Sequence, residues 1–233
     1  MNKKNEQSRK SPSRQRRELQ RAQYRSQIIR AAESLFLEHG YERTNLKQVA
    51  DKAGFVRATI YNYFVNGKED LYLAVAANIF QSLCEYVEEG LNQSRPGDEL
   101  LSMTTSYLNL ARKQPAHADI IDDVRLRQAL AIIVEKESKN IRLTDDEAHF
   151  RNYQMKTFEL LVSGITLAVT RLRISGLSSQ KIQEIAFAMS AIIPGWIKEL
   201  ARREIFAHQT PDVSESQLKL IIGFFEKGIR SMN

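Results

Sequence analysis

Apolar residues recur at three- and four-residue spacing along most of the chain, which is the period of a helix that buries one face. The first such stretch runs from Arg21 to a natural C-terminal cap at Gly40. A two-turn helix follows, opened by the Thr44 hydroxyl and stopped by Gly54, and residues 57–64 indicate another. The pattern therefore predicts three helices, with a glycine turn between the second and the third.

Helices of two turns do not persist alone in water, so these three helices must share a core. Its predicted members are Ile28, Ala32, Phe36, Val49, Ala53, Ile60 and Phe64. The small residues Ala50 and Gly54 would let the second and third helices cross at a steep angle. This is the helix-turn-helix geometry, in which the third helix can enter a DNA major groove.

Reading bases in that groove requires hydrogen-bonding groups, positive charge and apolar or aromatic contact. The residues expected on the exposed face of the third helix supply these groups: Arg57, Thr59, Tyr61, Asn62 and Tyr63.

The remainder of the chain predicts longer helices and no strand. Helical spacing and capping signals mark residues 68–91, 98–112, 120–134, 145–174 and 178–206, and a last helix from Ser214. Pro194 and Gly195 are expected to kink or interrupt the fifth of these. Only 10 glycines and 5 prolines occur in 233 residues, which argues against sandwiches and barrels. The predicted fold class is all-α, with an N-terminal three-helix helix-turn-helix domain and a larger helical bundle.

The last two predicted helices are apolar over more than one face, so a single core cannot easily cover them. They are the candidate dimer interface, and Trp196 and Phe224 suit buried anchors there. The predicted interface residues are Met189, Ile192, Trp196, Leu218, Ile222 and Phe225. The alternative for each is ordinary core packing.

Charge is distributed unevenly along the chain. The first 30 residues contain ten lysines and arginines against two glutamates, whereas the whole chain has a net charge of +6. The excess positive charge at this end favours contact with a polyanion, and the alternative is a solubilising tail. Residues 1–18 lack apolar periodicity and predict a disordered basic arm.

A set of residues in the N-terminal region carries a resemblance to known proteins: Ala31-Ala32, Leu35-Phe36, His39-Gly40-Tyr41, Thr44, Val49-Ala50, Ala53-Gly54, the run from Thr59 to Phe64 and the run from Lys68 to Leu71. In these residues the sequence resembles the DNA-binding domain of the TetR/AcrR family of bacterial transcriptional regulators, over about residues 22–72. The resemblance implies a homodimer, an all-α regulatory domain controlled by a small ligand, and a four-helix dimer seam at the last two helices.

Two features depart from the family pattern. Val56 stands where the family usually has a serine that caps the reading helix, so Arg57 would have to stabilise or position that helix end. One extra residue lies between Phe64 and Lys68, so Asn66 or Gly67 must open the fourth helix.

The resemblance also implies roles for individual residues. Contacts to base edges fall on Lys47, Arg57, Ala58, Tyr61 and Asn62, and contacts to phosphates fall on Thr44, Thr59, Tyr63 and Lys68. Lys68 would act at a helix N-terminus, where the dipole also favours an anion. The alternatives are that Tyr61 packs inside the core and that Lys47 and Lys68 belong to a solvated face. The basic arm could add minor-groove contacts.

Catalytic and metal chemistry find little support in the sequence. The single cysteine, Cys84, excludes an intramolecular disulfide and a cysteine-cluster metal site, and the four histidines lack ligand spacing. No glycine-rich phosphate loop or nucleophile motif appears, so we expect no cofactor, no metal and no enzyme activity. No apolar run reaches the roughly 18 residues that span a bilayer, and no secretory signal opens the chain. We expect a cytoplasmic protein that is associated with the nucleoid when it is bound to DNA.

Three parts are expected: a disordered basic arm over 1–18, a helix-turn-helix DNA-binding domain over 19–70, and an all-α ligand-sensing and dimerisation domain over 71–233. The leading hypothesis is a homodimeric repressor that an apolar or amphipathic small-molecule effector releases from a palindromic operator in double-stranded DNA. One alternative is a DNA-bound protein of the same fold that recruits a protein partner or activates transcription. The other is an enzyme.

The ligand pocket itself stays unassigned from sequence. Its lining could come from residues that an ordinary helical core also demands: Phe80, Leu83, Tyr107, Ile120, Val124, Phe158 and Leu161.

Overall fold

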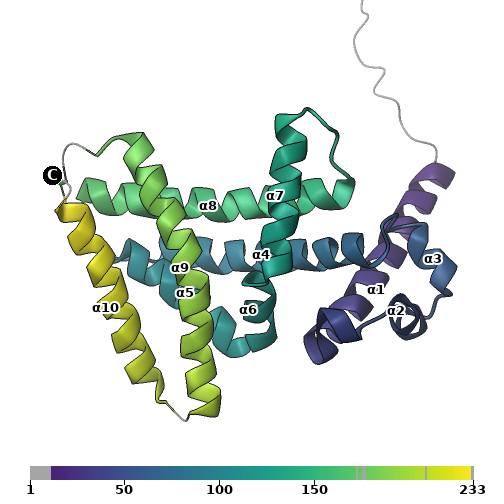
Figure 1. Cartoon of the computed structure of the whole chain (residues 1–233), viewed down its shortest axis with the longest axis horizontal. Coiled ribbons are helices and arrows are strands. Elements are labelled where there is room, and N and C mark those ends of the chain that lie inside the picture. Colours follow the sequence, from purple (N-terminus) through teal and green to yellow (C-terminus); the bar gives the residue numbers. More distant parts are fainter. Residues whose placement is uncertain (1–11, 172, 175–176, 208, 232–233) are drawn as a thin grey trace, which may run out of the picture. The chain divides into compact units, whose positions relative to one another are not determined.

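The computed structural model describes residues 12–171, 173–174, 177–207 and 209–231. Within these ranges the chain forms ten α-helices and no strand, which confirms the predicted all-α class (Figure 1). The helices are α1 (Pro12–Arg43), α2 (Leu46–Ala53), α3 (Arg57–Tyr61), α4 (Lys68–Asn92), α5 (Glu99–Lys113), α6 (Pro115–Ile121), α7 (Val124–Ser138), α8 (Asp145–Arg171), α9 (Ser179–Phe206) and α10 (Pro211–Arg230). The chain divides into two compact units between Val75 and Ala76, inside α4.

The N-terminal unit packs α1, α2 and α3 around the core that the sequence predicts. Each predicted core residue is at most 4% exposed: Ile28, Ala32, Phe36, Val49, Ala53, Ile60 and Phe64. The helix-turn-helix arrangement of the second and third helices follows from this shared burial, since neither short helix has enough internal hydrogen bonds to persist alone.

The first helix starts earlier than expected. It begins at Pro12, a residue whose fixed φ suits the first helical turn, so residues 12–18 of the predicted arm are helical. Residues 1–11 of that arm lie outside the described residues. At the other end, Gly40 has a φ of 78° and interrupts the helical backbone where the sequence places a cap.

Asn45, and not Thr44, caps the second helix. The Asn45 side chain accepts from the Gln48 N–H at 3.0 Å, and the Gln48 side chain accepts from the Asn45 N–H at 2.8 Å, forming a capping box. The Thr44 hydroxyl instead donates to the carbonyls of Leu35 (3.1 Å) and Gly40 (2.9 Å). The capping role predicted for Thr44 was wrong because carbonyls near the end of the preceding helix take its hydroxyl.

Gly54 is required by its backbone conformation and not by close helix packing. Its φ is 73°, and a Cβ at this position would meet no atom within 4 Å, so the steep-crossing argument was wrong for this glycine. Val56 opens α3 without a side-chain cap, as its side chain dictates. The helix ends at Tyr61, three residues before the predicted end, although the Phe64 N–H still donates to the Ile60 carbonyl at 2.9 Å.

The C-terminal unit is a helical bundle in which α5 packs against α6, α8, α9 and α10. The predicted helix over 120–134 is wrong: α6 and α7 are separate, and Asp123 caps α7 by accepting from the Arg125 N–H at 2.8 Å. In contrast, α9 continues through Pro194, and α10 begins at Pro211, before the predicted Ser214. None of the described helices combines the length and the hydrophobicity that a membrane crossing requires.

Candidate nucleic-acid interface and ligand cavity

The third helix presents a polar and aromatic face to solvent. Arg57, Ala58, Tyr61 and Asn62 are exposed, and Tyr61 at 43% exposure does not pack in the core, which removes that alternative. The Arg57 guanidinium donates to the Tyr61 hydroxyl at 3.2 Å and lies 5.9 Å from the centroid of its ring. Because the two residues are one turn apart, the arginine is held along the helix beside the aromatic ring, and the pair forms a single donor-rich patch.

The other predicted contact residues differ in their exposure. Lys47 is exposed on α2, whereas Thr59 and Tyr63 are half-buried on α3 and the turn that follows it. Lys68 is half-buried, and its Nζ lies 4.0 Å from the centroid of the Tyr41 ring. Thr44 is 1% exposed with its hydroxyl bonded to two carbonyls, so its side chain is unsuited to a phosphate contact.

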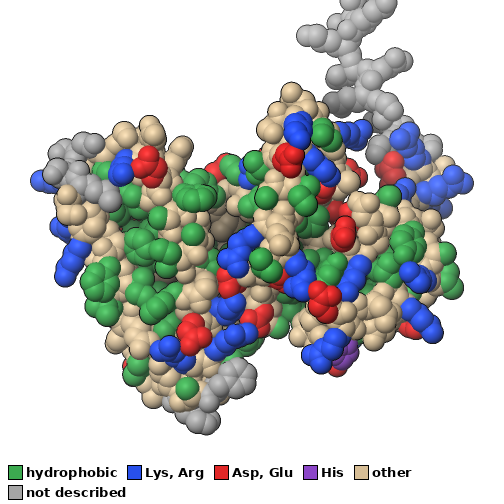
Figure 2. Space-filling model, in the orientation of Figure 1, with side chains coloured by type: hydrophobic (Ala, Val, Ile, Leu, Met, Phe, Trp, Pro, Cys, Tyr) green, Lys and Arg blue, Asp and Glu red, His purple; other side chains and the backbone are tan. Residues whose placement is uncertain are grey.

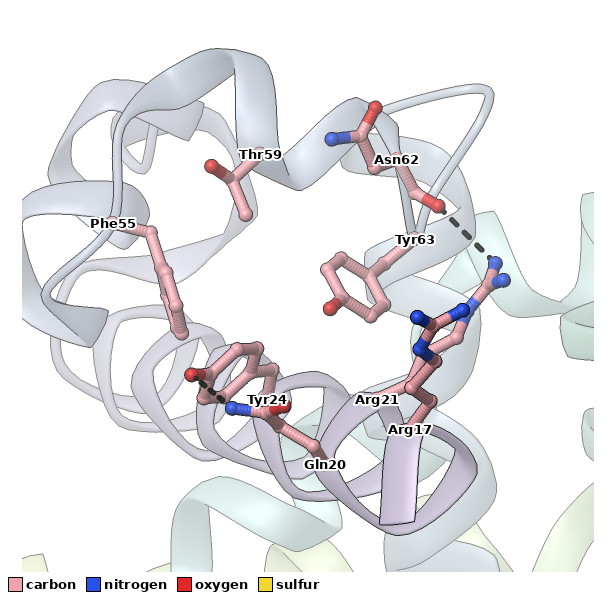
Figure 3. Close-up of a pocket in the computed structure, with 8 residues that line it drawn as sticks. All are labelled: Arg17, Gln20, Arg21, Tyr24, Phe55, Thr59, Asn62 and Tyr63. Carbon is pink, nitrogen blue, oxygen red and sulfur yellow. Dashed lines mark hydrogen bonds between the residues drawn. The ribbon is translucent and has the colours of Figure 1, made fainter. Parts of the chain in front are cut away.

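The N-terminal part of α1 and residues 55–63, which include α3, border an open notch of about 520 Å³ (Figure 3). Its lining residues are Arg17, Gln20, Arg21, Tyr24, Phe55, Thr59, Asn62 and Tyr63. In Figure 3 the two arginines lie on one side of the notch, and Tyr24 and Phe55 lie on the opposite side. None of these eight residues is acidic, so the notch carries two positive charges and no negative charge.

Contacts across the notch fix its shape. Arg21 reaches from α1 to the turn after α3, donating to the Asn62 carbonyl at 3.4 Å and lying 5.7 Å from the Tyr63 ring centroid. On the other side, the Tyr24 and Phe55 rings pack edge to face at 5.1 Å. These contacts join the basic helix to the predicted reading helix, so three of the predicted DNA-contact residues share one concave surface with two arginines.

Sequence reasoning missed Arg17 and Arg21 as members of this site. It placed Arg17 in a disordered arm that could add minor-groove contacts, and it counted Arg21 only as part of the local charge. The signal was nevertheless present, since Arg14, Arg17, Arg21 and Arg25 recur at three- and four-residue spacing and therefore lie on one face of a helix. Arg25 continues this stripe and lies 5.1 Å from the Phe64 ring centroid.

The C-terminal unit contains a cavity of about 700 Å³, a size typical of small-molecule sites. Most of its lining is apolar and comes from α4, α5, α7, α8 and α9. Five of the seven residues considered from sequence line it: Phe80, Leu83, Tyr107, Phe158 and Leu161. Ile120 is buried but does not line the cavity, and Val124 is exposed to solvent. These two residues lie on either side of the point where α6 ends and α7 begins.

Few polar groups border this cavity. The Tyr107 hydroxyl is buried and has no hydrogen-bond partner among the described residues. Burial, assisted by the negative charge of Asp122, raises the pKa of Tyr107, so the side chain is a neutral phenol at physiological pH. Asp122 itself is paired with Arg127, at 3.5 Å, and with Lys198.

Cys84 lies in the same unit and is 1% exposed. Burial raises the pKa of its thiol, which disfavours the reactive thiolate and fits a packing role for this side chain.

The residues predicted for the dimer interface divide into two groups. Met189, Leu218 and Ile222 are at most 2% exposed within a single chain, so they belong to the core of this unit, and assigning them to an interface was wrong. Ile192 and Trp196 are 51% and 39% exposed, and Phe225 is half-buried. Helical periodicity identifies apolar stripes, but it does not say which stripe the chain's own core covers.

Exposed apolar residues at four-residue spacing mark the outer sides of α9 and α10. We call Ile192, Trp196, Leu220 and Phe224 the apolar face. Figure 2 shows hydrophobic side chains gathered over these two helices. A patch of this kind on a folded chain is typical of an interaction surface.

Comparisons with known proteins agree with this geometry. Residues 28–75 match the model of the bacterial regulatory proteins of the tetR family. The probable HTH-type transcriptional regulator ArpR of Pseudomonas putida is 32% identical over 177 residues, which cover 74% of this chain and 78% of that protein. The chain belongs to the tetR family. It is a DNA-binding transcriptional regulator, as the resemblance in its N-terminal helices implied.

One more relative and two solved structures extend the likeness. The HTH-type transcriptional regulator TtgR, also from Pseudomonas putida, is 30% identical over 178 residues, which cover 75% of this chain and 78% of that protein. The fatty acid degradation regulator FadR from Bacillus halodurans shares the fold with a TM-score of 0.59 at 15% identity, over 86% of this chain and 93% of that one. FadR from Bacillus subtilis, solved in complex with stearoyl-CoA, gives a TM-score of 0.55 at 19% identity, over 87% and 98%.

Proposed function

We propose that this protein is a homodimeric cytoplasmic repressor that binds an operator through two helix-turn-helix units and releases it when a small molecule fills the 700 Å³ cavity. The observation that carries the DNA-binding part is the surface formed by α3 and the arginine-lined notch beside it. The division of roles follows the two compact units: DNA binding by the first, ligand sensing and dimerisation by the second.

The DNA contacts in this proposal combine the exposed α3 residues with the basic notch. Base edges would be read by Lys47, Arg57, Ala58, Tyr61 and Asn62, which offer donors, charge and an apolar methyl group. Phosphates would be held by Arg17, Arg21, Thr59, Tyr63 and Lys68. Lys68 would exchange its contact with Tyr41 for a phosphate.

A second copy of the chain is the proposed occupant of the apolar face, since tetR-family regulators act as dimers. A two-fold dimer presents two reading helices, and it thereby matches a palindromic operator with half-sites about one helical turn apart. Trp196 and Phe224 would serve as the buried anchors of this seam.

The effector part of the proposal is supported by the cavity. A closed core would have favoured recruitment of a protein partner, whereas the C-terminal unit holds a mainly apolar space of ligand size. FadR from Bacillus subtilis, which has this fold, was solved with stearoyl-CoA bound. A ligand that prefers the DNA-free state by about 1–3 kcal/mol would lower DNA affinity about 5- to 150-fold.

Binding to the operator should weaken steeply with salt. Selection of bound fragments from the source genome would identify the operator, and fluorescence anisotropy would then give its affinity at several salt concentrations. A contact surface of this kind predicts that the slope of log affinity against log salt concentration corresponds to on the order of 6 to 10 phosphate contacts. The reason is that each neutralised phosphate releases condensed counterions. A shallow slope would count against the α3 and notch surface as the DNA interface.

Replacing both notch arginines should weaken DNA binding without changing its sequence preference. Arg17→Gln with Arg21→Gln should reduce the salt slope by about 2 and lower affinity for specific and random duplexes by the same factor, since phosphates carry no sequence information. Arg16→Gln is the control for one of the two charges, because it removes a single positive charge from another face of α1. If the control produces half of the double variant's change in salt slope and in the logarithm of affinity, overall charge, and not the notch, is responsible.

A further inference from the structure

The Tyr107 hydroxyl is the unusual polar group of the C-terminal unit. The residue is 5% exposed and lines the cavity, and its hydroxyl has no hydrogen-bond partner among the described residues. Neighbouring hydroxyls in the lining are already used: Thr104 donates to the Leu100 carbonyl at 2.7 Å, and Thr157 donates to the Tyr153 carbonyl at 2.9 Å. A buried hydroxyl without a partner is costly, and a ligand oxygen would remove that cost.

The charges in the cavity wall limit what else a ligand can carry. Asp122 and Arg127 are the two charged lining residues, and they form an ion pair in which Lys198 is a further partner of Asp122. A cationic ligand would therefore lose its hydration without finding a free carboxylate. An anionic ligand would have to compete with Asp122 for Arg127, whose side chain is 63% exposed and already solvated, so it too would not recover the cost of entering an apolar cavity. A neutral ligand avoids this cost.

We infer that the effector is a neutral, mainly apolar molecule with a hydroxyl or carbonyl oxygen that forms a hydrogen bond with Tyr107. This inference rests on the proposed function and narrows it to one chemical class. The cavity supplies the binding energy through apolar contact, and Tyr107 selects molecules that place an oxygen beside it. The Asp122 carboxylate, close enough to raise the pKa of Tyr107, also disfavours an anionic oxygen at this position.

Four probes of nearly equal size test the inference at neutral pH in the absence of DNA: 4-octylphenol, octylbenzene, 4-octylbenzoate and 4-octylbenzylamine. Calorimetric titration of the full-length protein should show 4-octylphenol binding about tenfold more tightly than octylbenzene, since the extra oxygen pairs a buried hydroxyl. Both charged probes should bind more weakly than the phenol. Tighter binding of the benzoate or the amine, or no binding of any probe, would overturn the inference.

The Tyr107→Phe variant isolates the hydrogen bond. In this variant the affinity of 4-octylphenol should be about equal to that of octylbenzene, and the affinity of octylbenzene itself should be unchanged. Tyr86→Phe is the matched control, because Tyr86 contacts Lys113 and does not line the cavity. If the advantage survives in Tyr107→Phe, the inference is wrong. The melting temperature of the ligand-free variant reports its folding separately. If the variant is misfolded, the four-probe comparison in the wild type decides the question.

Failure of the inference is distinguishable from failure of the proposed function. If the phenol binds through Tyr107 but leaves operator affinity unchanged, the ligand class stands and the release mechanism fails. If DNA binding shows the expected salt slope but the phenol has no advantage, the regulator stands and the ligand class is wrong.

Discussion

Phe224→Glu is expected to convert the dimer into monomers and to lower affinity for a two-half-site operator by about 10²- to 10⁴-fold. Phe224 is 64% exposed on the apolar face, and in a two-fold interface each substitution occurs twice. Two carboxylates would then be buried in an apolar seam, which is strongly unfavourable. The loss on DNA follows because two linked reading helices bind with an effective concentration that separate monomers lack.

Analytical ultracentrifugation gives the oligomeric state, and anisotropy with single and double half-sites gives the two DNA affinities. Affinity for a single half-site should remain unchanged, since α3 is untouched. Ile132→Glu is the control: Ile132 is likewise a large exposed apolar residue, at 54%, but it lies on α7, outside the apolar face. A Phe224→Glu protein that remains dimeric would show that the seam lies elsewhere.

The helix-turn-helix core could be predicted from sequence because its periodicity has one interpretation. Ile28, Ala32 and Phe36 lie on one side of a helix because they are four residues apart, and an apolar side of this kind is buried. The two short neighbouring helices must use the same core. The ends of the helices were less predictable. Thr44 and Asn45 are both good capping residues, and tertiary contacts with two carbonyls decided between them.

The surfaces that bind partners depend on information that spacing does not contain. Met189 and Ile192 are three residues apart on one apolar helix, yet one is buried in the chain's own core and the other is exposed to solvent. The notch required knowing that α1 begins at Pro12, because only then do Arg17 and Arg21 share a helix face next to Tyr63. The missing partner of the Tyr107 hydroxyl, among the residues that the structure describes, is likewise a property of packing in three dimensions.

Arg171→Ala should destabilise the protein by about 3 kcal/mol, the low end of the cost of breaking a buried ion pair. Arg171, near the end of α8, pairs with Glu99 at the start of α5, and Glu99 is 0% exposed. Without the arginine, the donor that remains for the Glu99 carboxylate among the described residues is the Gly97 N–H, at 3.1 Å. The side chain of Arg171 is 39% exposed, so water can replace part of its charge, which places the expected loss at that low end.

Urea unfolding would measure this loss, and Arg202→Ala provides the matched control. Arg202 pairs with Asp119 at 2.7 Å, but both side chains are about half exposed, so its removal should cost less than about 1 kcal/mol. Glu99→Gln should also cost less than Arg171→Ala, because it removes the buried charge and leaves an arginine that can turn to solvent. If the two arginine variants lose equal stability, burial of Glu99 is not what makes this pair matter. If only Arg171→Ala is strongly destabilised, the α5–α8 contact depends on neutralising one carboxylate that the fold holds away from water.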